Sequence, residues 1–168
     1  RFSSGAVDVL VGTQMVAKGH DFPRVTLVGV ISADVGLGMA DFRAGERTFQ
    51  LLTQVAGRAG RGEVTGEAFV QTLYPDHYSI RHACNQAYRP FYDEEMRFRK
   101  ALRYPPMVSL VCAVVRGTTF RQTMQEAADL TARLRRLPSR FGVTGPAAAP
   151  IGRLRGQYRV QLFLKGPH

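Results

Sequence analysis

The sequence predicts an α/β protein in two parts, an incomplete parallel-sheet unit followed by a small α+β domain. Between residues 7 and 72 the predicted order is strand, strand, helix, strand, which is typical of units that alternate strands and helices. After residue 76, two helices lead into the order strand, helix, strand, strand, which favours a sheet with helices packed on one face. Tyr74-Pro75-Asp76 interrupts the pattern, so we predict two domains, 1–75 and 76–168.

The first part is defined by short apolar runs and one amphipathic helix. Phe49 and Leu52, with Val55 as a third candidate, have helical spacing and would face inward. Residues 34–41 are rich in glycine and predict an irregular segment. The predicted elements are buried strands at 7–11 and 25–31, a helix at 43–55 and a strand at 67–72. The strands needed to complete this sheet are expected to precede residue 1 in a longer protein.

The second part has helix signals at both ends of its segments. Pro90 is acceptable at a first helical position. Thr119, followed three residues later by Gln122, fits a capping box, and Pro138 closes the helix that it opens. The apolar face of that helix would comprise Met124, Ala127, Ala128, Thr131, Leu134 and Leu137. The other predicted elements are helices at 79–87 and 90–102, strands at 108–115, 141–144 and 157–164, and a loop at 145–150.

Charge is distributed unevenly along the chain. The net charge is +10, but residues 1–78 carry 7 Lys/Arg against 8 Asp/Glu, whereas residues 79–168 carry 16 against 5. A basic domain beside a neutral one favours a polyanionic partner. The alternative is a generally arginine-rich protein without such a partner.

The cysteines and the apolar runs exclude several protein classes. Cys84 and Cys112 are isolated, which argues against a metal site and a disulfide scaffold and fits a reducing, cytoplasmic compartment. No run reaches the roughly 18 apolar residues that a membrane-spanning helix needs. No signal peptide is visible, and the first residues are typical of the middle of a longer protein.

The chemistry is concentrated first in the segment Gln54-Val55-Ala56-Gly57-Arg58-Ala59-Gly60-Arg61-Gly62. Arg58 and Arg61 are three residues apart and would point the same way on a helical turn. Gly57 and Gly60, which precede them, let another body approach the backbone. Two forked guanidiniums on one face match a polyphosphate. A solvated Arg/Gly loop is the alternative interpretation.

A second motif, Val11-Gly12-Thr13-Gln14-Met15-Val16-Ala17-Lys18-Gly19-His20-Asp21-Phe22, follows the first predicted strand. In open α/β sheets, ligands bind at the edge where strands pass into loops. The two segments together resemble motifs V and VI of the superfamily 2 helicases. Further matches at residues 33–37, 40–47 and 104–106 resemble, within that superfamily, the C-terminal portion of the PriA family of replication restart helicases.

This resemblance implies a fold and a reaction. The first part would be a partial RecA-like lobe 2 of the P-loop NTPase fold, and the second a basic domain that binds DNA and partner proteins. The whole protein would be an ATP-dependent 3′→5′ DNA helicase that recognises stalled or branched forks and initiates primosome assembly. ATP and Mg²⁺ would be bound mainly by a first lobe, because the chain carries neither a phosphate loop nor the acidic magnesium ligands. The family also binds zinc, for which this chain has no ligands.

The resemblance also assigns roles to residues around the nucleotide. Arg61 would be the arginine finger and Arg58 its companion at the phosphates. Gln54, Gly57, Gly60, Gly19 and Asp21 would contact or approach the nucleotide. A structural salt bridge for one of the two arginines is the alternative, and His20 is assigned no chemistry.

DNA contacts are expected in both parts of the chain. In the first, they fall to Thr13, whose hydroxyl can donate to a phosphate, and to Gln14 and Lys18. In the second, Arg153, Arg155 and Arg159 alternate near Tyr158 before Lys165, which suits a nucleic-acid backbone with base stacking. By resemblance, this domain would bind branched and single-stranded DNA and contact the single-stranded DNA-binding protein and other primosome proteins. The alternative places Tyr158 in the core.

Three interpretations of function stay open on the sequence. The first is a fragment of an active restart helicase. The second is a DNA- and partner-binding restart scaffold with an inactive motor. The third is a basic RNA-binding module, which leaves the helicase-like half unexplained. In all three, the chain alone is expected to lack ATPase activity.

Overall fold

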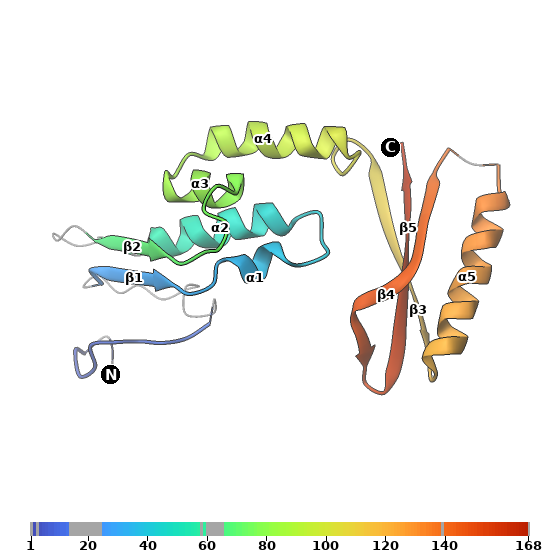
Figure 1. The fold of residues 1–168 in the computed structure, drawn as a ribbon, viewed down its shortest axis with the longest axis horizontal. Helices are drawn as coiled ribbons and strands as arrows, with labels where there is room; N and C mark the ends of the chain where they lie inside the picture. The colour runs from blue at the N-terminus through green and yellow to red at the C-terminus, as the bar shows by residue number, and fades with distance from the viewer. Residues whose placement is uncertain are drawn as a thin grey trace. The chain divides into compact units, whose positions relative to one another are not determined.

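The fold is described from a computed structural model, which places residues 2, 4–13, 25–57, 59, 66–138 and 140–167 (Figure 1). By its internal contacts the chain divides into two compact units, Arg1–Glu95 and Met96–His168. The predicted domain boundary after residue 75 stays a prediction. None of the helices in the described part of the chain has the length and apolar character needed to cross a lipid bilayer.

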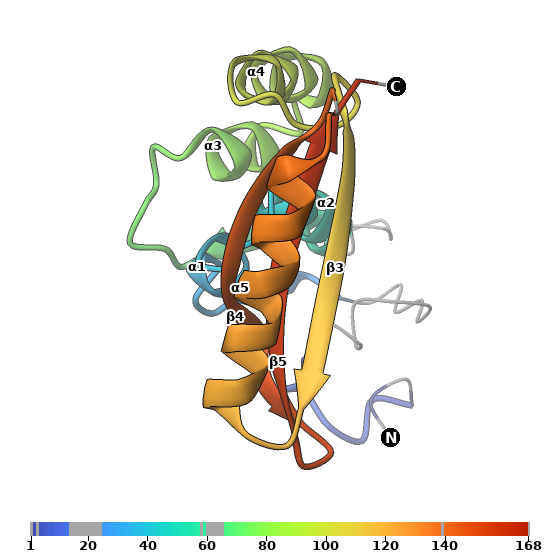
Figure 2. The same ribbon diagram turned by 90° about the vertical axis from the view of Figure 1, so that its right-hand side faces the viewer.

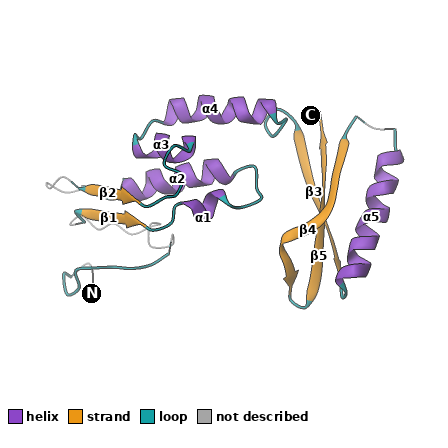
Figure 3. Ribbon diagram, in the orientation of Figure 1, coloured by secondary structure: helices purple, strands orange, loops and turns teal. Residues whose placement is uncertain are grey.

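The first unit combines a short parallel ladder with helices. Its elements are β1 (Leu27–Val30), α1 (Asp34–Leu37), α2 (Ala44–Ala56), β2 (Glu67–Val70), α3 (Tyr78–Cys84) and most of α4 (Tyr88–Ala101) (Figure 3). β1 pairs with β2 in parallel, in the register Leu27 to Glu67 and Val30 to Val70. The chain crosses from one strand to the other through α2, as parallel pairing requires.

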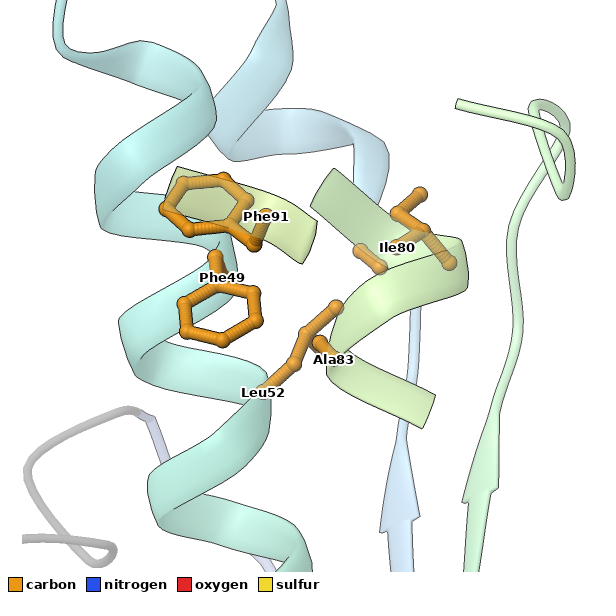
Figure 4. Close-up of a cluster of buried hydrophobic side chains, with 6 residues drawn as sticks. Phe49, Leu52, Ile80, Ala83 and Phe91 are labelled. Carbon is orange, nitrogen blue, oxygen red and sulfur yellow. The ribbon is translucent and has the colours of Figure 1, made fainter. Parts of the chain in front are cut away.

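The core of this unit lies between α2, α3 and α4. Phe49 and Leu52 of α2 are buried, as the helical spacing predicted, and Val55 is half-buried. They pack in a cluster with Ala33, Ile80, Ala83 and Phe91, most of which Figure 4 shows. The rings of Phe49 and Phe91 stack with centroids 3.9 Å apart. Burial of this apolar stripe therefore anchors α2.

Three predictions for the first unit are corrected by the structure. Residues 7–11 do not form a strand, and Val9 and Val11 are 75% and 86% exposed. A strand needs a hydrogen-bonding neighbour, and in the described part of the chain the parallel sheet contains β1 and β2 alone. β1 is also shorter than expected and not buried. Residues 34–37, predicted to be irregular, form α1, with Asp34 in its first turn, where a carboxylate is favourable.

The second unit is a three-stranded antiparallel sheet with one long helix. Its elements after α4 are β3 (Ser109–Gly117), α5 (Phe120–Arg136), β4 (Gly142–Leu154) and β5 (Gln157–Gly166), in the sheet order β3-β5-β4. α5 lies along one face of this sheet (Figure 2). Val160 and Leu162 of β5 are fully buried with Ala127 of α5. Alternate residues of β5 therefore point toward α5, which places Val160 and Leu162 in the core of this unit.

The predicted loop at 145–150 is wrong, because β4 continues through it. The prolines and glycines of this stretch indicated a loop, but β4 is an edge strand, where a missing N–H is tolerated. Its pairing with β5 shifts register between Thr144 and Ala147 and again between Ala148 and Arg153. Gly145 has a φ of +109°, and a Cβ there would lie 3.0 Å from the Gln161 carbonyl oxygen. Glycine is thus required at this irregularity.

The start of α5 confirms one prediction and corrects its detail. Thr119 is the N-cap residue, but its hydroxyl donates to Gln122 Oε1 at 2.8 Å and makes no hydrogen bond to the helix backbone. The buried stripe of α5 is Thr123, Ala127 and Thr131. Leu137, predicted to face the core, is 54% exposed because it lies just after the last helical residue.

Candidate nucleotide and nucleic-acid site

The predicted nucleotide site begins where α2 ends. Gln54 is half-buried in the last turn of the helix, and Gly57 is its C-cap residue, with its N–H donating to the Thr53 carbonyl oxygen at 3.0 Å. The φ of Gly57 is −67°, which any residue adopts, but a Cβ there would lie 3.3 Å from the Thr53 carbonyl oxygen, so the tight helix end itself favours glycine. The core-anchored helix therefore leads the chain directly to the first Gly-Arg pair.

Most of the predicted nucleotide and motor residues lie outside the described part of the chain. These are Gln14, Lys18, Gly19, Asp21, Arg58, Gly60 and Arg61. Thr13 is described and is exposed, in a stretch without regular secondary structure. The roles of all these residues stay predictions.

Asp34 makes a pair of hydrogen bonds, here called the Asp34 clasp, at the carboxyl ends of the parallel strands β1 and β2. The sequence did not predict this contact. One carboxylate oxygen of Asp34 accepts from the Thr72 hydroxyl, and the other accepts from the Leu73 N–H at 2.9 Å. These two hydrogen bonds, that from Thr72 first, lower the pKa of Asp34. The clasp ties the start of α1 to the chain after β2. The available signal was a carboxylate three residues after a predicted strand.

A second ionic contact fixes the start of α2. Arg47 forms a salt bridge with Asp41 at 2.9 Å, and Asp41 also accepts from the Arg43 N–H at 2.9 Å. The ion pair of Arg47 that the structure describes thus involves an acidic residue that precedes the helix.

The predicted DNA-binding residues of the second unit do not all share one face, and their contact with DNA stays a prediction. Arg153 lies opposite Tyr158 in the β4–β5 ladder, and Arg159 lies opposite Arg116 in the β3–β5 ladder. Because neighbouring residues of a strand point to opposite faces, Tyr158 and Arg159 diverge. Arg155 lies in the turn between β4 and β5.

The basic residues thus form two groups, the first of which is Arg153 stacked on Tyr158. The guanidinium carbon of Arg153 lies 5.1 Å from the ring centroid of Tyr158, and Phe120 meets that ring edge-on at 6.0 Å between centroids. Tyr158 is half-buried, whereas Arg153 and Arg155 are exposed. This geometry leaves the guanidiniums accessible and the tyrosine ring largely occupied.

Arg116 and Arg159 form the second group and lie side by side on the sheet face away from α5. Like charges directly opposite each other are unfavourable in a ladder. The buried Nε of Arg159 also has no hydrogen-bond partner in the described part of the chain. Both features favour a nearby anion.

Lys165 is engaged within the protein. Its Nζ donates to the Leu102 carbonyl oxygen at 3.1 Å and lies 4.0 Å from the ring centroid of Tyr104. The ammonium therefore holds the turn after α4 against the end of β5. A DNA contact by Lys165 stays a prediction and would compete with these two interactions.

Comparison with known proteins identifies two matching families. Residues 1–63 match the Helicase conserved C-terminal domain, which implies a RecA-like lobe, and residues 100–168 match the Primosomal protein N C-terminal domain. The structure itself is mixed α/β with small sheets, in agreement with the coarse fold class predicted.

Similar full-length proteins share one name. Replication restart protein PriA of Bacillus subtilis is 44% identical over 165 residues, covering 98% of this chain. Those of Treponema pallidum and Synechocystis are 43% and 44% identical, each over 99% of this chain. The chain spans 20% of the length of the Bacillus and Synechocystis proteins and 26% of the Treponema protein. From these matches across both units, the chain belongs to the PriA family of replication restart proteins, of which it represents a C-terminal portion.

Proposed function

We propose that the complete protein carrying this chain is an ATP-dependent 3′→5′ DNA helicase that recognises stalled or branched replication forks and initiates primosome assembly. The family membership supports a role in replication restart, and the match to a helicase C-terminal domain supports a motor. The excess of basic residues after residue 78 supports a DNA partner.

One observation carries the motor assignment. Gly57, at the C-terminal end of the core-anchored α2, is followed immediately in the sequence by Arg58. α2 is held in the core by a buried apolar stripe, and an arginine that stabilises charge on a transferring phosphoryl group must act from a rigid support. We assign Arg61 as the arginine finger and Arg58 as its companion, with Gln54, Gly57, Gly60, Gly19 and Asp21 around the nucleotide.

In this proposal, Thr13, Gln14 and Lys18, in the motif at residues 11–22, contact DNA and couple the motor to it. ATP is the substrate, with Mg²⁺ and most phosphate contacts supplied by the first lobe of the motor. The C-terminal domain would bind forked DNA and partner proteins, including the single-stranded DNA-binding protein.

The decisive experiment compares two arginine variants of the complete protein. Arg61→Ala should lower DNA-stimulated ATP turnover by about 10³- to 10⁵-fold while ATP binding changes little, since an arginine finger acts in the transition state. Arg89→Ala is the matched control, because the Arg89 side chain is 80% exposed and pairs with Asp93 within α4. Unchanged turnover in Arg61→Ala would refute the finger assignment. A wild-type protein that binds forks without hydrolysing ATP would favour the scaffold with an inactive motor.

A further inference from the structure

The tip of the β4–β5 hairpin carries an arginine in an unfavourable backbone conformation. The two strands are joined by Arg155 and Gly156, whose φ angles are +50° and +80°. Two-residue turns of this kind prefer asparagine or aspartate at the first position, because a bulky side chain clashes with its own backbone there. Arg155 is exposed, so packing does not explain its presence. An exposed arginine in a strained backbone conformation at a hairpin tip is a candidate for a binding role.

A chain of ring contacts orients a second arginine beside it. Arg153 lies over the ring of Tyr158, and Tyr158 is held in turn by the edge-on ring of Phe120 at the start of α5. Stacking restricts the guanidinium to one orientation, so less side-chain entropy is lost when it binds. The arrangement is suited to presenting N–H donors to an oxyanion.

The surrounding sequence leaves these arginines without acidic neighbours. β4 and β5 contain no aspartate or glutamate, and the last acidic residue of the chain is Asp129. Within the described ranges, neither Arg153 nor Arg155 forms an ion pair. Two exposed guanidiniums with no internal counter-ion are complementary to a polyanion such as the phosphodiester backbone.

We propose that Arg153 and Arg155 at the hairpin tip bind phosphates of the DNA backbone, and that Tyr158 is a positioning residue for Arg153 that does not stack on a base. This inference rests on the proposed function and assigns its DNA contact to one end of the second unit. Tyr158 is half-buried, Arg153 lies over its ring, and Phe120 contacts that ring in a T-shaped arrangement. Two side chains therefore already occupy ring surface that a base would need for stacking.

The test measures binding of fluorescent forked DNA by the complete protein over a range of salt concentrations. One lost phosphate contact weakens affinity about five- to eightfold near 0.1 M salt and lowers the salt slope by about 1. Arg153→Ala should show this loss, and Tyr158→Leu should show nearly the same loss. The double variant should be no weaker than either, because both changes remove one contact. Tyr158→Phe keeps the ring and should bind normally.

Controls separate this mechanism from simpler ones. Arg133→Ala removes an exposed charge from α5 and should have a smaller effect than Arg153→Ala. Arg153→Lys keeps the charge but loses the planar stack, and should weaken binding. Circular dichroism monitors folding, and if Tyr158→Leu fails to fold, Arg153→Ala, Arg155→Ala and Arg153→Lys still decide the question.

Three results would overturn the inference. Additive losses in the double variant, with no change of salt slope in Tyr158→Leu, would make Tyr158 a base-stacking residue. Normal DNA binding in Arg153→Ala and Arg155→Ala, with weakened binding of an acidic peptide, would assign the tip to a protein partner. Normal binding of both ligands would leave the tip without a binding role. A wild-type protein that does not bind forks would instead refute the proposed function.

Discussion

The ring of Phe91 in α4 lies flat on the ring of Phe49 in α2, with centroids 3.9 Å apart and planes only 6° apart. Both side chains are 4% exposed. The ring of Tyr78 also stacks on Phe91, with ring centroids 5.9 Å apart. Phe91 is therefore a central side chain of the cluster that anchors α2. Since α2 leads to the Gly-Arg pairs, its packing bears on the proposed motor.

Phe91→Ala should lower the free energy of unfolding by about 3–5 kcal/mol, because it removes a buried ring and leaves a cavity. Urea denaturation followed by circular dichroism measures the change. Tyr92→Ala, on the same helix but 41% exposed, is the control and should cost about 1 kcal/mol or less. Equal effects of the two substitutions would show that the stack does not hold α2 in place.

Lys165→Met should destabilise the second unit by about 1–2 kcal/mol, since it keeps the apolar stem and loses the hydrogen bond to Leu102 and the contact with Tyr104. Denaturation of the variant is compared with that of Lys100→Met, which alters an exposed lysine near the end of α4. DNA affinity is measured on the same samples. Unaltered stability with a lower salt slope would instead identify Lys165 as a phosphate contact.

His77 should make the first unit less stable in mild acid. Its Nδ1 accepts from the Ser79 N–H at 3.3 Å at the start of α3, so only the form with unprotonated Nδ1 caps the helix. Burial lowers the pKa of His77 below its ordinary value of 6.5, although Glu94 and Glu95 oppose this shift. The stabilisation is therefore complete above that ordinary value and is lost as the pH falls through the lower, folded-state pKa.

The pH dependence is measured by urea denaturation between about pH 7.5 and pH 5, over the range in which histidine titrates. His77→Asn supplies a capping side chain that does not titrate, so its free energy of unfolding should vary less over this range. Parallel curves for wild type and His77→Asn would contradict the proposed cap.

The sequence predicted what depends on periodicity and missed what depends on neighbours. Phe49 and Leu52 were found because helical spacing identifies a buried stripe whatever it packs against. Residues 7–11 have the composition of a strand, but strand formation also needs a pairing partner, which composition does not reveal. In residues 145–150, prolines indicated a loop because the edge position of β4, where they are tolerated, is a property of the sheet order.

The candidate sites divide in the same way. Arg153, Arg155, Tyr158 and Arg159 were identified from the sequence, but the pairing of Arg153 with Tyr158 and of Arg159 with Arg116 follows from the register of β3, β4 and β5. The Asp34 clasp needed a contact with Thr72, far away in the sequence. For the Gly-Arg pairs, the structure describes α2 as far as its C-cap residue, Gly57. The proposed contacts of Arg58 and Arg61 with the nucleotide depend on the sequence motif.

The parallel ladder of β1 and β2 has a consequence for local motion in the first unit. In this chain, which spans 20% and 26% of the length of the Bacillus subtilis and Treponema pallidum proteins, Leu27 and Phe69 are 62% and 61% exposed, whereas Phe49, Leu52 and Phe91 are almost fully enclosed. Cooperative units with few buried contacts open at lower free energy than those with many. In the chain by itself, amide hydrogens of the two strands should therefore exchange with solvent before those of the α2 core.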